Sequence, residues 1–263
     1  YMRQTFFSTQ RRDKWWMEPA LAALGFSCFV IYTTWRALSG IDFHFENYLS
    51  PFYSPLLFEN PFGEGVGHSW FGAWPAAIPA WIPASPAIFI LIFPLSFRLT
   101  CYYYRKAYYR AFTFSPPACA VKGIPQKNYK GETGILWVQN LHRYAMYFAI
   151  IFIFLLSYDA VMSFFRNGEF GVGIGSIILL INPILLGGYT FGCHSLRHLI
   201  GGRMDCFSCS HSAEHAHSRW KIVTYLNRRH QMFAWFSLVW VGLSDVYVRL
   251  VSMGVITDLN TWV

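Results

Sequence analysis

The sequence predicts an all-α integral membrane protein, a bundle of five transmembrane helices that forms a single membrane domain over residues 1–263. Composition is the first reason. Of the 263 residues, 54% are hydrophobic and only 13% are charged, about half the charged fraction of an ordinary soluble domain. The second reason is that five stretches are long and apolar enough to cross a bilayer, which takes about 20 residues.

The predicted helices lie at about 17–38, 72–110, 144–164, 171–200 and 220–252. The first follows Arg11, Arg12 and Lys14 and lacks a clear small-residue cleavage site, so we expect it to remain as a helix and not to be removed as a signal peptide. The second carries five prolines between residues 75 and 94. Its first half is therefore expected to be irregular, with a helix from about Ile88.

The distribution of Lys and Arg predicts the orientation, because cytoplasmic loops carry the excess of these residues. With the N-terminus inside, segments 1–18, 98–143 and 193–230 hold 18 of the 21 basic residues. This orientation places the N-terminus in the cytoplasm and the C-terminus outside. It gives an outer loop at about 41–74 and inner loops at about 111–143 and 200–220. The net charge of +8 is thereby explained by membrane-flanking loops, and nucleic-acid binding is not expected.

Most of the residues able to bind metals fall on the predicted inner side. They are His142, His194, His198, His211, His215, His217 and His230, with Cys101, Cys119, Cys193, Cys206 and Cys209. His194 and His198 are four residues apart and share a helical face, while Cys206 and Cys209 form a CxxC pair. Thiols and imidazoles together fit a structural zinc, a Rieske-type [2Fe–2S] cluster or part of a larger site. Haem b is a further alternative, with His142 and His230 as axial ligands on two helices.

Phenols and guanidiniums on the same side predict a quinone pocket, because they can hydrogen-bond a quinone carbonyl and relay protons. Tyr104 and Arg105 lie in the aromatic and basic tract from Cys101 to Arg110. The pocket predicted from these features consists of Tyr104, Arg105, His142, Arg143 and His230. The alternative interpretation of the tract is an interfacial aromatic belt with snorkelling basic side chains.

Four motifs resemble a known family. They are Cys101-Tyr-Tyr-Tyr-Arg-Lys, Ser115-Pro-Pro-Ala-Cys119, Gln139-Asn-Leu-His142-Arg-Tyr144 and Cys193-His-Ser-Leu-Arg-His198-Leu-Ile-Gly-Gly202. In this order, over about residues 90–250, they resemble the membrane-anchor subunit of actinobacterial-type succinate dehydrogenase, respiratory complex II. The resemblance implies a five-helix anchor in the bacterial plasma membrane. It also implies flavoprotein and iron–sulfur partner subunits on the cytoplasmic face, with succinate oxidation on those partners.

The resemblance further implies a Rieske-type [2Fe–2S] cluster that passes electrons to a membrane quinone. Matched position by position, its ligands are Cys119, Cys193, His194 and His198, with His142 and His230 as substitutes and the pair Cys206 and Cys209 as alternative ligands. Adjacent positions of a helix diverge by about 100°, so Cys193 and His194 can share a cluster only if the helix unwinds there. Two other functions remain open: a haem b anchor of another respiratory oxidoreductase, and a non-redox membrane scaffold with structural zinc.

Overall fold

The computed structural model describes residues 5–59, 69–79, 81–124, 140–202 and 204–262. The helices are α1 (Met17–Ser39), α2 (Ala87–Leu99), α3 (Tyr102–Phe112), α5 (His142–Met162), α6 (Ile174–Phe191), α7 (His194–Gly201), α8 (His211–Arg228) and α9 (His230–Ser252). Four short strands form two antiparallel hairpins, β1 (His44–Phe45) with β2 (Tyr48–Leu49) and β3 (Phe165–Arg166) with β4 (Glu169–Phe170).

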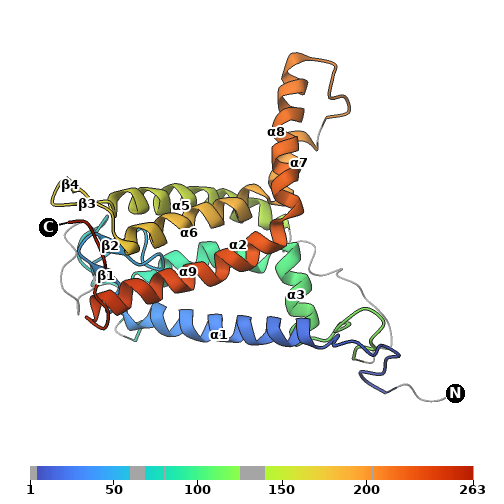
Figure 1. The fold of residues 1–263 in the computed structure, drawn as a ribbon, viewed down its shortest axis with the longest axis horizontal. Coiled ribbons are helices and arrows are strands. Elements are labelled where there is room, and N and C mark those ends of the chain that lie inside the picture. The colour runs from blue at the N-terminus through green and yellow to red at the C-terminus, as the bar shows by residue number, and fades with distance from the viewer. Residues whose placement is uncertain (1–4, 60–68, 80, 125–139, 203, 263) are drawn as a thin grey trace.

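The helices α1, α2, α5, α6 and α9 run alongside one another as a bundle (Figure 1). Four of them, α1, α5, α6 and α9, are each long and apolar enough to cross a membrane, and α2 with α3 gives a fifth span if that bent pair counts as one. Large apolar side chains remain exposed along these helices, for example Leu24 and Ile31 on α1, as expected where the solvent is lipid. The predicted all-α membrane fold is confirmed.

Three predicted helices are broken, all at the same end of the bundle. The helix expected to run on to residue 110 ends at Leu99 and resumes as α3 after a bend of 82°. The helix expected over 171–200 is divided into α6 and α7, and the one expected over 220–252 into α8 and α9. In Figure 1, α3 and α8 leave the bundle in opposite directions, roughly perpendicular to its axis. Hydropathy misses these breaks because a window of about 20 residues averages across them.

The proline-rich start of the second span is not helical. Among the described residues of 72–86 the chain makes turns and bends, and α2 begins only at Ala87, directly after Pro86. Each proline removes a backbone donor and restricts the residue before it, which disfavours a helix. The irregular segment expected before Ile88 is therefore present, and the helix itself is shorter than the predicted span.

The two ends of the bundle differ in character. One end, called here the hairpin end, carries β1 to β4 and the C-terminus; the other, the cysteine end, carries Cys101, Cys193 and the perpendicular helices (Figure 1). At the hairpin end a buried ion pair joins Arg249 Nε to Asp245 Oδ2 at 2.8 Å. The distribution of Lys and Arg predicts that the cysteine end is the cytoplasmic one; the arrangement of the helices does not test this orientation.

Candidate metal and quinone site

Four side chains able to bind metals meet at the cysteine end, one from each of four helix starts. They are Cys101, His142, Cys193 and His230, called here the Cys/His cluster. Their exposed fractions are 2%, 8%, 1% and 2%. Cys101 and Cys193 belong to one buried core together with Phe97, Tyr104 and Tyr189. Buried thiols and imidazoles in one place are the donors of Cys₂His₂ metal sites.

All four residues lie where a helix begins. Cys101 is the N-cap of α3 (φ −69°, ψ 131°) and Cys193 is the N-cap of α7 (φ −63°, ψ 140°), so both have extended backbone between two helices. His142 and His230 are the first residues of α5 and α9. The helix does unwind at Cys193, as a shared cluster requires, but the imidazole that reaches this cysteine belongs to His142 and not to the adjacent His194.

The cluster consists of two sulfur–imidazole contacts. His142 Nε2 lies 3.0 Å from Cys193 Sγ, and His230 Nε2 lies 3.6 Å from Cys101 Sγ. The other ring nitrogen of His142 is 2.9 Å from Thr100 Oγ1. The Nδ1 atom of His230 is buried without a hydrogen-bond partner. A hydrogen bond on the second nitrogen orients an imidazole ligand, and a buried nitrogen without a partner is costly unless something binds it.

Aromatic rings enclose the cluster. Phe97 stacks on His142 with ring centroids 4.7 Å apart, and Tyr189 stacks on His230 at 4.8 Å. Tyr189 is fully buried, and its hydroxyl has no hydrogen-bond partner by geometry although it faces the Cys101 thiol. The cluster therefore has a buried, largely aromatic surrounding.

Burial controls the protonation of Cys193. Desolvation raises the pKa of this thiol to about 11, although the backbone amides of Ser195 and Leu196 act in the opposite direction. Amides at a helix start favour a thiolate. Without a cation the sulfur is thus a neutral thiol at pH 7, and a bound metal would be needed to hold it as a thiolate.

The ligand set predicted from the family resemblance is not brought together. Among the described residues, no three His, Cys, Asp or Glu side chains converge on a single metal ion. Cys119 is exposed, 3.8 Å from Arg110 Nη2, and His194 and His198 are exposed on α7. The CxxC pair, Cys206 and Cys209, forms a disulfide before α8. Of the four predicted ligands only Cys193 lies in the Cys/His cluster.

The sequence places Cys101 among the possible metal donors but not in the predicted ligand set. It lies in the aromatic and basic tract, yet it precedes a helix just as Cys193 does. His142 and His230 were predicted as substitutes and as quinone residues, and both are in the cluster. Of the remaining predicted quinone residues, Tyr104 and Arg105 are buried and Arg143 is exposed.

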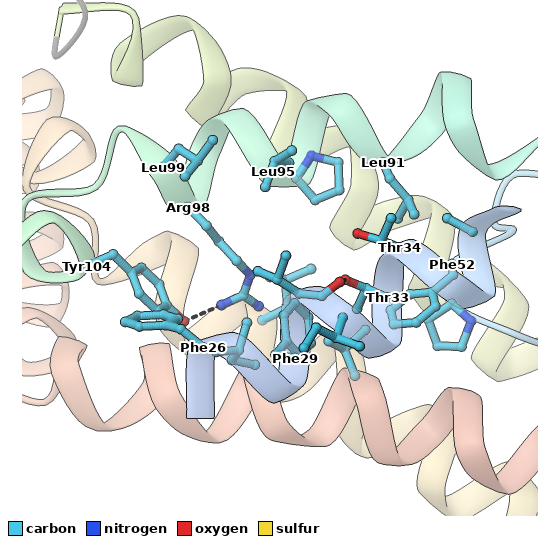
Figure 2. A pocket seen from close by; sticks show the side chains of 18 of the residues that line it. Phe26, Phe29, Thr33, Thr34, Phe52, Leu91, Leu95, Arg98, Leu99 and Tyr104 are labelled. Carbon is cyan, nitrogen blue, oxygen red and sulfur yellow. Dashed lines mark hydrogen bonds between the residues drawn. The ribbon is translucent and has the colours of Figure 1, made fainter. Parts of the chain in front are cut away.

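An apolar groove of about 780 Å³ runs between α1, α2 and α9 (Figure 2). Its end at Tyr104 lies beside the cluster, because Tyr104 shares a buried core with Cys101 and Cys193. Its lining is largely aliphatic and aromatic, and Arg98 and Tyr104 lie at the cluster end. Arg98 Nη1 donates to Tyr104 Oη at 2.5 Å, and Nη2 donates to Ser237 Oγ at 3.1 Å. The Arg98 guanidinium also lies 5.1 Å from the ring centroid of Tyr189, which stacks on His230. One aromatic layer thus separates the groove from the cluster.

Comparison with known proteins gives two matches. The family model of the actinobacterial succinate dehydrogenase subunit SdhC matches residues 17–254. A solved chain from the "Mycobacterium smegmatis Sdh1 complex in the apo form" is 44% identical, with a TM-score of 0.86, over 97% of this chain and 94% of that one. No curated protein matches.

The family model covers nearly the whole helix bundle. The solved chain has the same fold, and its sequence identity of 44% indicates a common family as well as a common fold. The solved neighbour is a chain of the Mycobacterium smegmatis Sdh1 complex. The chain therefore belongs to the family of the actinobacterial succinate dehydrogenase subunit SdhC, the membrane subunit of a respiratory complex.

Proposed function

We propose that this membrane subunit passes electrons from its partner subunits to a quinone through a Rieske-type [2Fe–2S] cluster held by Cys101, Cys193, His142 and His230. The observation that carries the proposal is the meeting of two buried thiols and two buried imidazoles at four helix starts. This ligand set replaces three of the four residues predicted from sequence, because those three are exposed at the surface.

The donor set fits the chemistry of such a cluster. Rieske centres bind one iron through two cysteines and the other through two histidines, and when bound they accept and release one electron at a time. Cys101 and Cys193 would supply the thiolates, and His142 and His230 the imidazoles. A centre with two irons does not need its donors to converge on one point, which agrees with the absence of a single-ion site among the described residues.

Residues around the donors have identifiable tasks. Thr100 holds the ring of His142 through Nδ1, which leaves Nε2 as its free donor atom. Phe97 and Tyr189 cover the two imidazoles and exclude water. A dry, apolar surrounding is one of the means by which proteins set a reduction potential.

The groove is the proposed quinone site. Its apolar walls suit an isoprenoid tail, and the guanidinium of Arg98 at the cluster end suits a quinone carbonyl. Tyr104 also donates to the carbonyl of Ala234, so its position is fixed before any ligand binds. Tyr104 accepts a hydrogen bond from Arg98 and so holds the guanidinium at this end of the groove. This assignment keeps Tyr104 from the predicted pocket and adds Arg98.

The cysteine end is the proposed docking face for the flavoprotein and iron–sulfur subunits. The Cys/His cluster lies at this end, and α3 and α8 extend from it on either side (Figure 1). Basic side chains are concentrated in these segments, which favours association with a partner of opposite charge. Electrons arriving from a partner cluster would then have only a short distance to cross.

The test is electron paramagnetic resonance and iron analysis of the purified complex. Cys101→Ser and His230→Ala are expected to remove the signal of a reduced Rieske-type centre. The matched controls Cys119→Ser and His194→Ala are expected to keep it, because these side chains are exposed. Loss of the signal in the controls, with retention in Cys101→Ser, would show that the sequence-based ligand set is correct.

Haem b is the second candidate, because His142 and His230 are buried on different helices as bis-imidazole ligation requires. A b-type absorption spectrum in the purified complex would favour it. Zinc without iron, and no resonance signal after reduction, would favour the third candidate, a non-redox scaffold.

A further inference from the structure

The end of α8 that points away from the bundle carries a second group of metal donors (Figure 1). It consists of His211 and His215 in the first turns of α8 and the disulfide-bonded pair Cys206 and Cys209 just before the helix. The proposed redox role of the chain does not use these residues, so the inference that follows does not depend on it.

The two imidazoles face each other through the same atom. His211 Nε2 and His215 Nε2 lie 3.0 Å apart, and both side chains are exposed. Nitrogens that each bind one zinc ion at about 2.0–2.1 Å are roughly 3.0–3.5 Å apart. The observed separation of the two nitrogens is therefore that of two ligands of one ion, and rotation of the two exposed rings would direct both nitrogens at it.

The carboxylate of Glu214 lies next to the other ring nitrogen of His211. Glu214 Oε2 lies 3.9 Å from Nδ1 of His211, the ring nitrogen that faces away from His215. Metal-binding histidines commonly direct their second ring nitrogen to a carboxylate, which fixes the tautomer and increases ligand basicity. In this arrangement Nε2 of His211 is the nitrogen left free for a metal.

The cysteines supply the remaining donors when they are reduced. Only Ser210 separates Cys209 from His211, and all four donors fall within residues 206–215. Both spacings, C-x₂-C and H-x₃-H, are those of structural zinc ligands. A dithiol reductant converts the disulfide to two thiols and is itself oxidised to a disulfide; each thiol then releases one proton as it binds the metal.

We propose that this segment binds one zinc ion through His211 and His215, with the thiolates of Cys206 and Cys209 completing the site in the reduced protein. Oxidation of the pair removes two of the four donors. The site is thus a zinc site whose affinity depends on the redox state of the CxxC pair, separate from the Cys/His cluster.

Zinc titration of the intact complex, in competition with a chromogenic chelator, tests the proposal. In the presence of a dithiol reductant we expect one zinc ion per chain, with affinity lowered at least tenfold by His211→Ala with His215→Ala. The matched control His198→Ala changes an exposed histidine of α7 and is expected to leave the affinity unchanged. Omission of the reductant, or Cys206→Ser with Cys209→Ser, is expected to weaken binding as well.

Two outcomes overturn the proposal. The first is zinc binding that the histidine double variant does not weaken more than the control does. The second is an affinity that neither the reductant nor the cysteine variants alter, which removes the thiolates from the site. Iron content and the resonance signal of the complex, measured on the same samples, report separately on the Cys/His cluster.

Discussion

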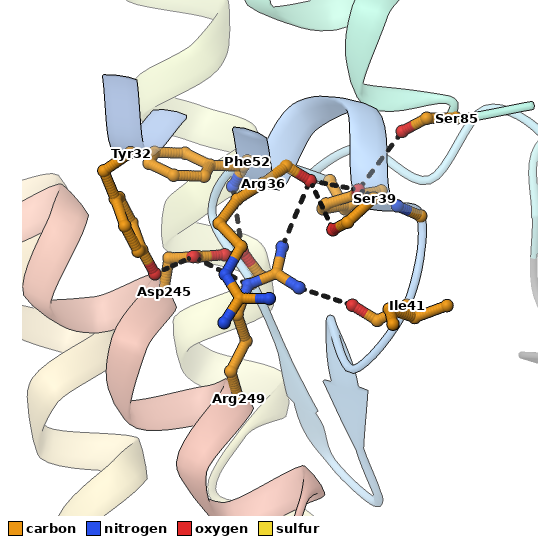
Figure 3. Close-up of polar contacts among 11 residues, drawn as sticks. Tyr32, Arg36, Ser39, Ile41, Phe52, Ser85, Asp245 and Arg249 are labelled. Carbon is orange, nitrogen blue, oxygen red and sulfur yellow. Dashed lines mark hydrogen bonds and ion pairs between the residues drawn. The ribbon is translucent and has the colours of Figure 1, made fainter. Parts of the chain in front are cut away.

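Replacement of Arg249 by methionine is expected to destabilise the hairpin end strongly. The guanidinium is 1% exposed and its partner Asp245 is fully buried, with Nε and Oδ2 2.8 Å apart. Figure 3 shows how the pair is held: Tyr32 donates to the same carboxylate at 2.5 Å, and Arg249 donates to the carbonyl of Ile41. The pair therefore connects α1, α9 and the segment that follows α1.

The magnitude follows from the charge that remains. Removal of one partner leaves an uncompensated charge in a buried place, which costs about 3–5 kcal/mol. For a chain of this size about 1 kcal/mol lowers a thermal midpoint by roughly 2–4 °C, so Arg249→Met should lower it by about 6–20 °C. The double variant Asp245→Leu with Arg249→Met leaves no net charge behind, and we expect it to recover part of the loss.

The assay is the thermal midpoint for loss of monodisperse complex in detergent, followed by size-exclusion chromatography. Arg166→Met is the matched control, because Arg166 pairs with Glu46 at the same end but both side chains are partly exposed. Ion pairs between exposed side chains contribute about 0–1 kcal/mol to the free energy of unfolding. A midpoint for Arg249→Met within about 2 °C of the control would refute the assigned role of burial.

Three further substitutions test the site and the packing. Tyr189→Phe removes a buried hydroxyl that has no hydrogen-bond partner in the structure, so the fold should persist. In the proposed centre this hydroxyl would be available to donate to the sulfur of Cys101, and its removal should lower the midpoint potential by about 40 mV, the equivalent of about 1 kcal/mol for one electron; an unchanged potential in a redox titration would refute that hydrogen bond. Arg98→Leu should raise KM for quinone about tenfold, since it removes a charged donor, while succinate oxidation with a soluble acceptor stays normal. Gly175→Ala places a Cβ 2.6 Å from the ring of Tyr48. The free energy of unfolding is expected to fall by about 1–3 kcal/mol, which would be measured as a lower thermal midpoint.

Hydropathy and charge could predict the bundle because both are properties of long segments. The apolar stretches that contain α5, α6 and α9 are recognisable without any tertiary information. The break at Cys193 is different, because it is confined to Gly192 and Cys193, and the sequences on both sides of these two residues form helices. Only the packing of α7 and α8 against each other and the bundle explains why the chain turns there.

The ligands were harder to predict for a related reason. A linear motif groups residues that are neighbours in sequence, so it predicts Cys193 and His194 as ligands of the same cluster. In the structure the partner of Cys193 is His142, 51 residues away along the chain. The signal that could have found the set is positional: Cys101, like Cys193, directly precedes a helix after a long apolar run.

The position of the four donors at helix starts has an electrostatic consequence. Cys101 and Cys193 are N-caps, and His142 and His230 open their helices. A helix start carries a partial positive charge of about half an elementary charge, together with amides that lack partners within the helix. Reduction of an iron–sulfur centre adds one negative charge, so four helix starts around it would stabilise the reduced state. In a buried site, where solvent screens little, the same four helix starts that carry the donors would therefore also favour the acceptance of an electron.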